Sequence, residues 1–280
     1  MDVEQLQAEL LTWYRENRRE LPWRETDDPY EVLVAEIMLQ QTQVARVVPK
    51  WEAFLDRFPT VEDLADAPLR EVLQLWDGLG YNNRAKYLKQ AAEQVVEEFD
   101  GEFPRDPDQL ETLQGVGEYT ANAVASFAFN NGGPVFDTNV RRLLYRFHGA
   151  ATDAELKAVH EQLFPTGESR VWNNAVMELG AEVCVDGTPR CRECPWREDC
   201  EAFRAKTFDT PDVQSQSSFE GSWRQYRAKV LKLLMDGAKP REELSAALEL
   251  PEEYSINELL AELAAEGMIE ETATGYRLPD

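Results

Sequence analysis

Four cysteines lie within seventeen residues of this 280-residue chain, and they restrict the fold of that segment more than any other feature. They are Cys184, Cys191, Cys194 and Cys200, separated by six, two and five residues. Thiols this close in sequence can converge on one ion or cluster at little loop-closure cost. Disulfides fit less well, because no secretory signal is recognisable and a reducing cytoplasm is expected. The spacing predicts a bound metal and suits zinc and an iron-sulfur cluster about equally.

The chain is strongly acidic, with a formal net charge of -24 and a pI near 4.5. A uniformly acidic surface repels polyanions over a Debye length, so charge alone argues against a nucleic-acid partner. The excess Asp and Glu can instead form a solvated coat suited to very high salt, where screening removes that repulsion. We favour this halophilic interpretation. No apolar stretch approaches the ~20 residues of a membrane helix, so we expect no membrane association and a cytoplasmic location.

Apolar residues recur at helical spacing along most of the chain, which predicts a mainly α fold. Asp28 and Pro29 precede "YEVLVAEIMLQQTQV", indicating a capped helix that is apolar on nearly every side and therefore central. Periodicity is lost over 207–221, as in a linker. Helical patterns follow near 223–235, 240–248 and 255–266, and "MIEETATGYRLPD" predicts a hairpin turning at Thr274 and Gly275. This order suggests a winged-helix-like domain over 222–280.

Two carboxylates stand out. Glu36 interrupts the apolar run "VLVAEIMLQ", and burial there would raise its pKa towards neutrality, as general acid-base catalysis requires; an ordinary surface glutamate is the alternative. Asp137 precedes a helix and could simply be its N-cap. A carboxylate kept ionised by helix amides could also stabilise an oxocarbenium-like sugar. Tyr119 and Asn139 could supply hydrogen bonds to such a site.

Two further segments could contact phosphate. Gly115, Val116 and Gly117 lie between helical patterns, where a tight turn exposes backbone amides at the start of the second helix; a plain turn is the alternative. Three arginines lie among the cysteines and form a local basic patch, which could instead balance the charge of a bound cluster: Arg190, Arg192 and Arg197. The histidines, His148 and His160, lack ligand spacing, and we interpret both as structural.

Several of these stretches together resemble the MutY-type adenine glycosylases, within the helix-hairpin-helix iron-sulfur DNA glycosylases. The matching motifs are "LPWR" at 21, "AEIMLQQTQVARV" at 35, "WDGLGYNNRAKYL" at 76, "LQGVGEYTANAV" at 113, "FDTNVRR" at 136 and the cysteine pattern. The resemblance covers about residues 5–205. It implies a bilobal core over 1–206, with a cluster lobe at about 1–26 and 132–206 and a helical barrel lobe at about 27–131. The linker 207–221 and the winged-helix-like domain would follow.

The resemblance also implies roles for individual residues. The four cysteines would bind a [4Fe-4S] cluster. Glu36 would protonate the adenine ring and Asp137 would stabilise the sugar cation, with Tyr119 and Asn139 beside the reacting sugar and water. Gln41 and Tyr81 would insert into the duplex after a nucleotide is flipped out. Strand-cutting relatives carry lysine at the position of Tyr119, and tyrosine cannot form their Schiff base, so the enzyme would be monofunctional.

The implied function is adenine excision in base excision repair, by a monomer acting on double-stranded DNA with A:G or A:8-oxoguanine mispairs. A mismatch thymine or uracil glycosylase of the same fold is an alternative. A non-catalytic DNA-binding regulator is a third, although such a protein has no use for Glu36 and Asp137 facing phosphate. Two departures from the family bear on specificity: the ~70 residues after 210 are too few for a MutT-like domain, and Asn82 and Asn83 follow Tyr81.

The C-terminal segment has an acidic candidate recognition helix, "SINELLAELAAE", which contains neither lysine nor arginine. Glu258, Glu262 and Glu266 recur there at four-residue spacing and would repel phosphates. We therefore expect this domain to pack against the core or a protein partner rather than to bind the major groove.

Overall fold

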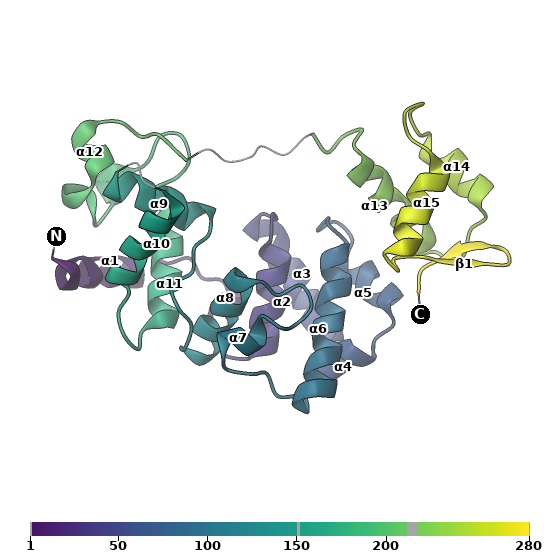
Figure 1. Cartoon of the computed structure of the whole chain (residues 1–280), viewed down its shortest axis with the longest axis horizontal. Coiled ribbons are helices and arrows are strands. Elements are labelled where there is room, and N and C mark those ends of the chain that lie inside the picture. The colour runs from purple at the N-terminus through teal and green to yellow at the C-terminus, as the bar shows by residue number, and fades with distance from the viewer. Residues whose placement is uncertain (1, 150–151, 212–217, 280) are drawn as a thin grey trace. The chain divides into compact units, whose positions relative to one another are not determined.

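The computed structural model describes residues 2–149, 152–211 and 218–279 (Figure 1). These residues are mainly helical, as the apolar periodicity predicts, and the strands among them form one two-stranded hairpin. They divide into two compact units. The first contains the described parts of 1–36, 104–112 and 116–214, and the second those of 37–103, 113–115 and 215–280. The predicted lobe boundaries are not tested by this division and stay predictions.

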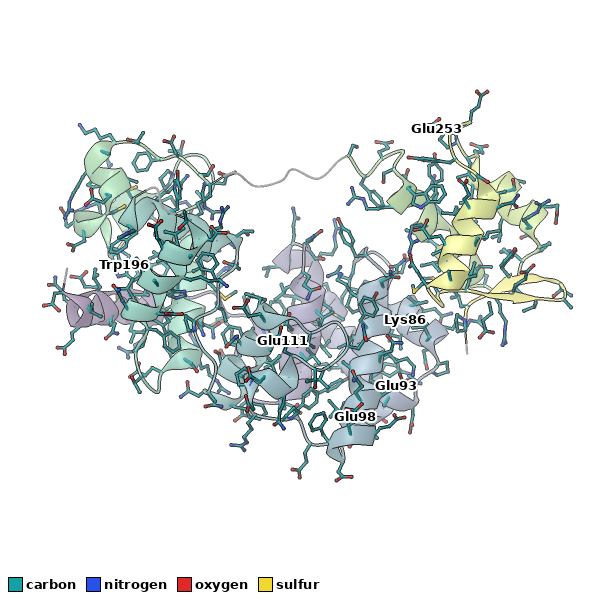
Figure 2. All side chains as sticks on the ribbon, in the orientation of Figure 1. Lys86, Glu93, Glu98, Glu111, Trp196 and Glu253 are labelled. Atoms are coloured by element: carbon teal, nitrogen blue, oxygen red, sulfur yellow. The ribbon has the colours of Figure 1, made fainter. Side chains whose placement is uncertain are left out.

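The first unit is built from helices that bury one apolar core. Leucines of α1 (Val3–Asn17) pack with residues of α9 (Thr138–His148), α10 (Asp153–Leu163) and α11 (Ser169–Glu178). The unit also contains η1 (Pro22–Arg24), most of α2 (Pro29–Leu39), α7 (Pro107–Leu110), α8 (Glu118–Phe129), a π-turn η2 (Leu179–Val183), η3 (Cys191–Glu193), η4 (Arg197–Asp199) and α12 (Glu201–Ala205). Trp196, labelled in Figure 2, lies in this core and donates its indole N–H to the Leu6 carbonyl at 2.9 Å. That bond fixes the cysteine segment to α1.

Helix α2 confirms the prediction of a capped, central helix. The Asp28 carboxylate accepts the Tyr30 backbone N–H at 2.8 Å, and Pro29 occupies the first helical position, where a missing N–H costs nothing. Every residue from Val32 to Met38 is buried. A helix buried on all sides fixes the position of any charged group that it carries.

The second unit contains α3 (Val44–Arg57), α4 (Val61–Asp66), α5 (Leu69–Trp76) and α6 (Asn83–Phe99), together with the C-terminal segment, which follows the first unit's helices in the sequence. That segment forms α13 (Trp223–Leu234), α14 (Arg241–Leu248), α15 (Ile256–Ala265), β1 (Glu270–Thr272) and β2 (Gly275–Arg277), which confirms the predicted three helices and hairpin. The predicted turn position was wrong by one residue, because Thr272 pairs with Gly275 and the turn is therefore Ala273–Thr274. Gly275 begins β2 at φ +143°, and a Cβ there would lie 2.2 Å from the Lys239 carbonyl oxygen.

The C-terminal segment packs against α5 and α6 within the second unit, in line with the expected packing. Arg70 donates its guanidinium to the Met235 carbonyl at 2.8 Å and its backbone N–H to the Pro279 carbonyl at 3.1 Å. Asn83 donates to the Glu266 carboxylate at 2.8 Å, and Lys86, labelled in Figure 2, donates to the Glu266 carbonyl. Among the described residues, no helix is both long and apolar enough to cross a membrane.

Candidate active site and cysteine centre

Glu36 is the buried charge that the sequence predicts. Only 5% of its surface is exposed, and burial raises its pKa to about 7. A hydrogen bond from Tyr119 and the charge of Arg24 oppose this rise, whereas the nearby Asp137 adds to it. A carboxyl group with a pKa near neutrality can give up a proton and accept one back at physiological pH.

Tyr119 and Asp137 come to Glu36 from two different helices. Tyr119 lies in the first turn of α8, and its hydroxyl bonds the Glu36 carboxyl and lies 4.0 Å from the Met177 sulfur. Asp137 is the N-cap of α9, as predicted, and accepts the Val140 N–H at 2.7 Å. Asn139 donates to the other Asp137 oxygen at 3.0 Å. The structure therefore brings all four predicted catalytic residues into one cluster in the first unit.

Opposing effects act on the Asp137 carboxylate, and the expectation that helix amides keep it ionised stays a prediction. Burial is the largest effect and raises its pKa above the ordinary value. The bonds from Val140 and Asn139 and the charge of Arg142 lower the pKa and only partly offset this burial. The reason is that one capping position offers few donors, whereas the low dielectric acts on the whole carboxylate.

Hydrogen bonds from one arginine connect this cluster to the cysteine segment. Arg142 donates to the Asn139 side-chain oxygen at 2.9 Å and to the carbonyls of Gly180 and Cys184 at 2.8 Å each. Gly180 belongs to η2, and a Cβ there would lie 2.9 Å from the Asn139 carbonyl oxygen. The close approach of η2 to the start of α9 therefore requires glycine at this position.

Sequence reasoning missed an ion-paired network beside the cluster. Glu178 is fully buried, and its carboxylate accepts from Arg24 at 2.7 Å and from Arg19 at 2.8 Å. Burial raises the pKa of Glu178, but the bonds from the two arginines outweigh burial and hold it at about 2. Arg24 ends the "LPWR" motif, and Glu178 interrupts an apolar helix face as Glu36 does. That same signal could have identified Glu178.

The turn at 115–117 has the predicted glycine geometry. Gly115 takes φ +78°, and a Cβ there would lie 2.6 Å from the Tyr87 Cβ. Gly117 is the N-cap of α8 and supplies no side-chain cap, while Val116 between the two glycines is buried. Because glycine has no side chain, residue 117 does not cap the first amides of α8, and an anion-binding turn requires such uncapped amides. Whether they contact phosphate stays a prediction.

Gln41 and Tyr81, the two residues expected to insert into a duplex, lie in the second unit. Both are exposed, and both take left-handed backbone conformations, at φ +55° and +47°. Arg84 links the residues just before them, because it donates to the carbonyl of Gln40 at 2.6 Å and to that of Gly80 at 3.0 Å. Strained non-glycine residues persist only where the surroundings fix them, and they cluster at functional sites.

The four cysteines are free thiols that line a single pocket with Phe147 and Trp196. Burial raises the pKa of Cys194 to about 12, so a set of thiolates here needs a compensating positive charge. Arg146, only 2% exposed, lies 3.6 Å from the Cys184 sulfur. Four thiols that line one pocket beside a buried arginine have the chemistry of an all-thiolate metal or iron-sulfur donor set. In the described part of the chain, no three His, Cys, Asp or Glu side chains are placed to hold a metal ion.

The three predicted arginines of this segment differ in their surroundings. Arg190 and Arg192 are exposed, and among the described residues neither forms an ion pair. Arg197 instead pairs with Glu198 at 2.5 Å and lies 5.7 Å from the Phe203 ring. Arg190 and Arg192 thus remain available to an anion, while Arg197 is partly neutralised.

Comparison with known proteins identifies the family. A family model described as "HhH-GPD superfamily base excision DNA repair protein" matches residues 34–165. The adenine DNA glycosylase of Mycolicibacterium smegmatis is 41% identical over 277 residues, covering 96% of this chain and 94% of that protein. The chain belongs to the adenine DNA glycosylase family. The human adenine DNA glycosylase is 41% identical over 79% of this chain and 43% of its own length.

Solved structures support the fold of this adenine glycosylase family member. A thermostable thymine-DNA glycosylase matches 72% of this chain and 97% of its own, with a TM-score of 0.68 and 30% identity. Endonuclease III in a non-covalent complex with DNA matches 74% of this chain and 98% of its own, with a TM-score of 0.63 and 25% identity. The 96% coverage by the M. smegmatis relative includes most of the C-terminal segment, so this segment also occurs in an adenine DNA glycosylase of similar length.

Proposed function

We propose that this chain hydrolyses the N-glycosidic bond of adenine mispaired with guanine or 8-oxoguanine in DNA, without cutting the strand. The cluster of Glu36, Tyr119 and Asp137 carries the proposal. A buried acid beside a second carboxylate is the arrangement that glycosidic cleavage uses. The adenine DNA glycosylase relatives support adenine as the base.

In the proposed reaction the target nucleotide is flipped out of the duplex into this cluster. The Glu36 carboxyl gives its proton to the adenine ring, the bond from C1′ to the base breaks, and its electron pair leaves with the base. The Asp137 carboxylate stabilises the positive sugar. Water then attacks C1′ and gives a proton to the Glu36 carboxylate, which leaves adenine and an abasic site.

The absence of strand cleavage rests on the residue at position 119. A lyase step needs an amine that attacks C1′ and forms a Schiff base. Tyr119 has a hydroxyl instead, and the surroundings of this hydroxyl raise its pKa well above the ordinary value, chiefly through burial. It therefore stays protonated and serves as a hydrogen-bond donor to Glu36.

We further propose that Cys184, Cys191, Cys194 and Cys200 hold a [4Fe-4S] cluster rather than zinc. The support is the all-thiolate donor set lining one pocket beside Arg146. A bound cluster would supply a rigid crosslink, and the chain around it would present Arg190 and Arg192 to phosphate. Iron, acid-labile sulfide and zinc are measured in anaerobically purified protein; zinc in place of iron would refute this assignment.

The test of activity uses labelled duplexes with A opposite 8-oxoguanine, A opposite G and T opposite G, in concentrated KCl. Strand breaks are scored with and without alkali. We expect breaks only after alkali and only in the adenine strand, and none with Glu36→Gln. Cleavage of the thymine strand would instead support the mismatch thymine alternative, which the similarity to a thymine-DNA glycosylase structure favours. Breaks without alkali would refute the monofunctional assignment.

A further inference from the structure

A groove of about 630 Å³ lies within the second unit, between α13 and the loops that carry Gln41 and Tyr81. Its lining includes Arg46, Tyr87, Phe219 and Arg224. This volume is within the range of sites that enclose a molecule the size of a nucleotide. The groove therefore joins the C-terminal segment to the two residues expected to enter the duplex.

The exposed aromatic residues of the chain gather in this groove. Among the described residues, the large hydrophobic side chains with high exposure are Tyr81 at 39%, Tyr87 at 37% and Phe219 at 53%. All three line the groove. Single exposed hydrophobic residues are normal on a protein surface, but a shared groove that collects them indicates a binding surface. Aromatic faces of this kind are platforms on which nucleic-acid bases stack.

The groove is also locally basic in a chain with a net charge of -24. Four arginines line it, of which Arg227 is paired with two glutamates, against one acidic residue, Asp77, which pairs with Lys232 at 3.1 Å. Arg46 is exposed, and no ion pair of Arg46 occurs among the described residues. The Arg224 guanidinium lies 5.6 Å from the centre of the Tyr81 ring and donates to its hydroxyl.

Part of the acidic face of α15 is paired inside the second unit, which the sequence did not indicate. Glu262 pairs with Arg227 at 2.6 Å, and Glu266 accepts from Arg227 and Asn83. The single charge of Arg227 therefore offsets part of the charge of Glu262 and Glu266, through contacts inside the second unit. The basic helix of the C-terminal segment is α13, which carries Arg224, Arg227, Lys229 and Lys232 and no acidic residue.

We propose that this groove binds one strand of the DNA, with bases stacked on Tyr81 and Phe219 and phosphates paired with Arg46 and Arg224. The inference rests on the proposed function, because that duplex is the DNA concerned. The C-terminal segment is then a DNA-binding element that acts through α13 and the residues before it. This replaces the expectation that the segment only packs against the core or a protein partner.

The test measures the affinity of the full chain for fluorescein-labelled duplexes, with and without an A:G mispair, over a series of KCl concentrations. Phe219→Ala and Arg224→Ala should each weaken binding on the order of tenfold. Arg224→Ala should also reduce the slope of log affinity against log salt by about 0.9, the amount expected for one lost phosphate contact. Lys229→Ala is the matched control, because Lys229 is exposed on the same helix and does not line the groove.

Arg46→Ala provides a second test that leaves the contact between Arg224 and Tyr81 in place, and it should reproduce the loss of affinity and slope. Binding by all three groove variants that equals binding by Lys229→Ala would overturn the inference. Binding is scored apart from excision. If the groove variants bind DNA more weakly but the wild type releases no adenine, DNA binding by the groove is supported and the proposed function is refuted. If the wild type excises adenine but the groove variants bind DNA as tightly as the wild type, only DNA binding by the groove is refuted.

Discussion

Replacing Glu36 by glutamine should stabilise the folded protein at neutral and alkaline pH while abolishing its proposed chemistry. The carboxyl is 5% exposed, and burial is the largest contribution to its raised pKa. The folded protein must therefore keep a poorly solvated charge whenever Glu36 is ionised. Glutamine has nearly the same size and carries no charge. Active sites often keep an ionisable group that lowers the stability of the fold because the group is needed for function.

The magnitude follows from the pKa. Folding raises the pKa of Glu36 from 4.5 to about 7, and each pKa unit corresponds to about 1.4 kcal/mol, so the ionised form costs about 3 kcal/mol. Below pH 4.5 the carboxyl is protonated in both states and the cost is absent. Between pH 4.5 and 7 the folded state holds a proton that the unfolded state has lost, so stability falls as pH rises. Above pH 7 the cost is complete and constant.

Urea unfolding of wild type and Glu36→Gln at a series of pH values from 5 to 8 measures this difference. We expect the variant to gain on the order of 1–3 kcal/mol over wild type at pH 8, with the gain shrinking towards pH 5. The exposed Glu97→Gln is the matched control and should show no such trend. A variant that is less stable than wild type at pH 8, or a difference that does not change with pH, would refute the reasoning.

Three further outcomes follow from the site. Tyr119→Phe removes the hydrogen bond that lowers the pKa of Glu36, so the alkaline limb of the single-turnover rate profile should move to higher pH; an unmoved limb would contradict this bond. Glu178→Gln leaves Arg24 buried without its charge partner and should cost about 3–5 kcal/mol in urea unfolding; a loss below 1 kcal/mol would contradict it. Cys200→Ser should lose visible absorbance and bound iron together, and full retention of iron would exclude Cys200 as a ligand.

Local patterns predicted the features that depend on neighbouring residues. Asp28 and Pro29 mark the start of α2 because capping involves groups within a few residues of one another. The burial of Glu36 could be predicted because a single acid stands among apolar residues on both sides. The three C-terminal helices begin and end within two residues of their predicted limits because their apolar periodicity is regular. In each case the deciding interaction lies within one or two helical turns.

Features that depend on distant residues could not be predicted in this way. Arg24 and Glu178 are 154 residues apart in sequence, so no local pattern pairs them. The pKa of Asp137 depends on how much of the fold encloses it, which a capping motif does not reveal. The prediction for the C-terminal segment rested on the acidic face of α15, whereas Arg227, from another helix, pairs with both Glu262 and Glu266. Ion pairing between helices therefore offset part of the acidic charge that the sequence suggested.

The distribution of cations explains how so acidic a chain could bind a polyanion. Arg142 and Arg146 point inward and donate to carbonyls around Cys184, so they serve the cysteine segment. Arg190, Arg192 and Arg46 are exposed without ion pairs among the described residues. A few unpaired cations, neutral helix amides and aromatic faces can contact DNA without a broad positive field. Each phosphate contact adds about 0.9 to the salt slope, so such a surface should keep its affinity in concentrated salt better than one with many charged contacts.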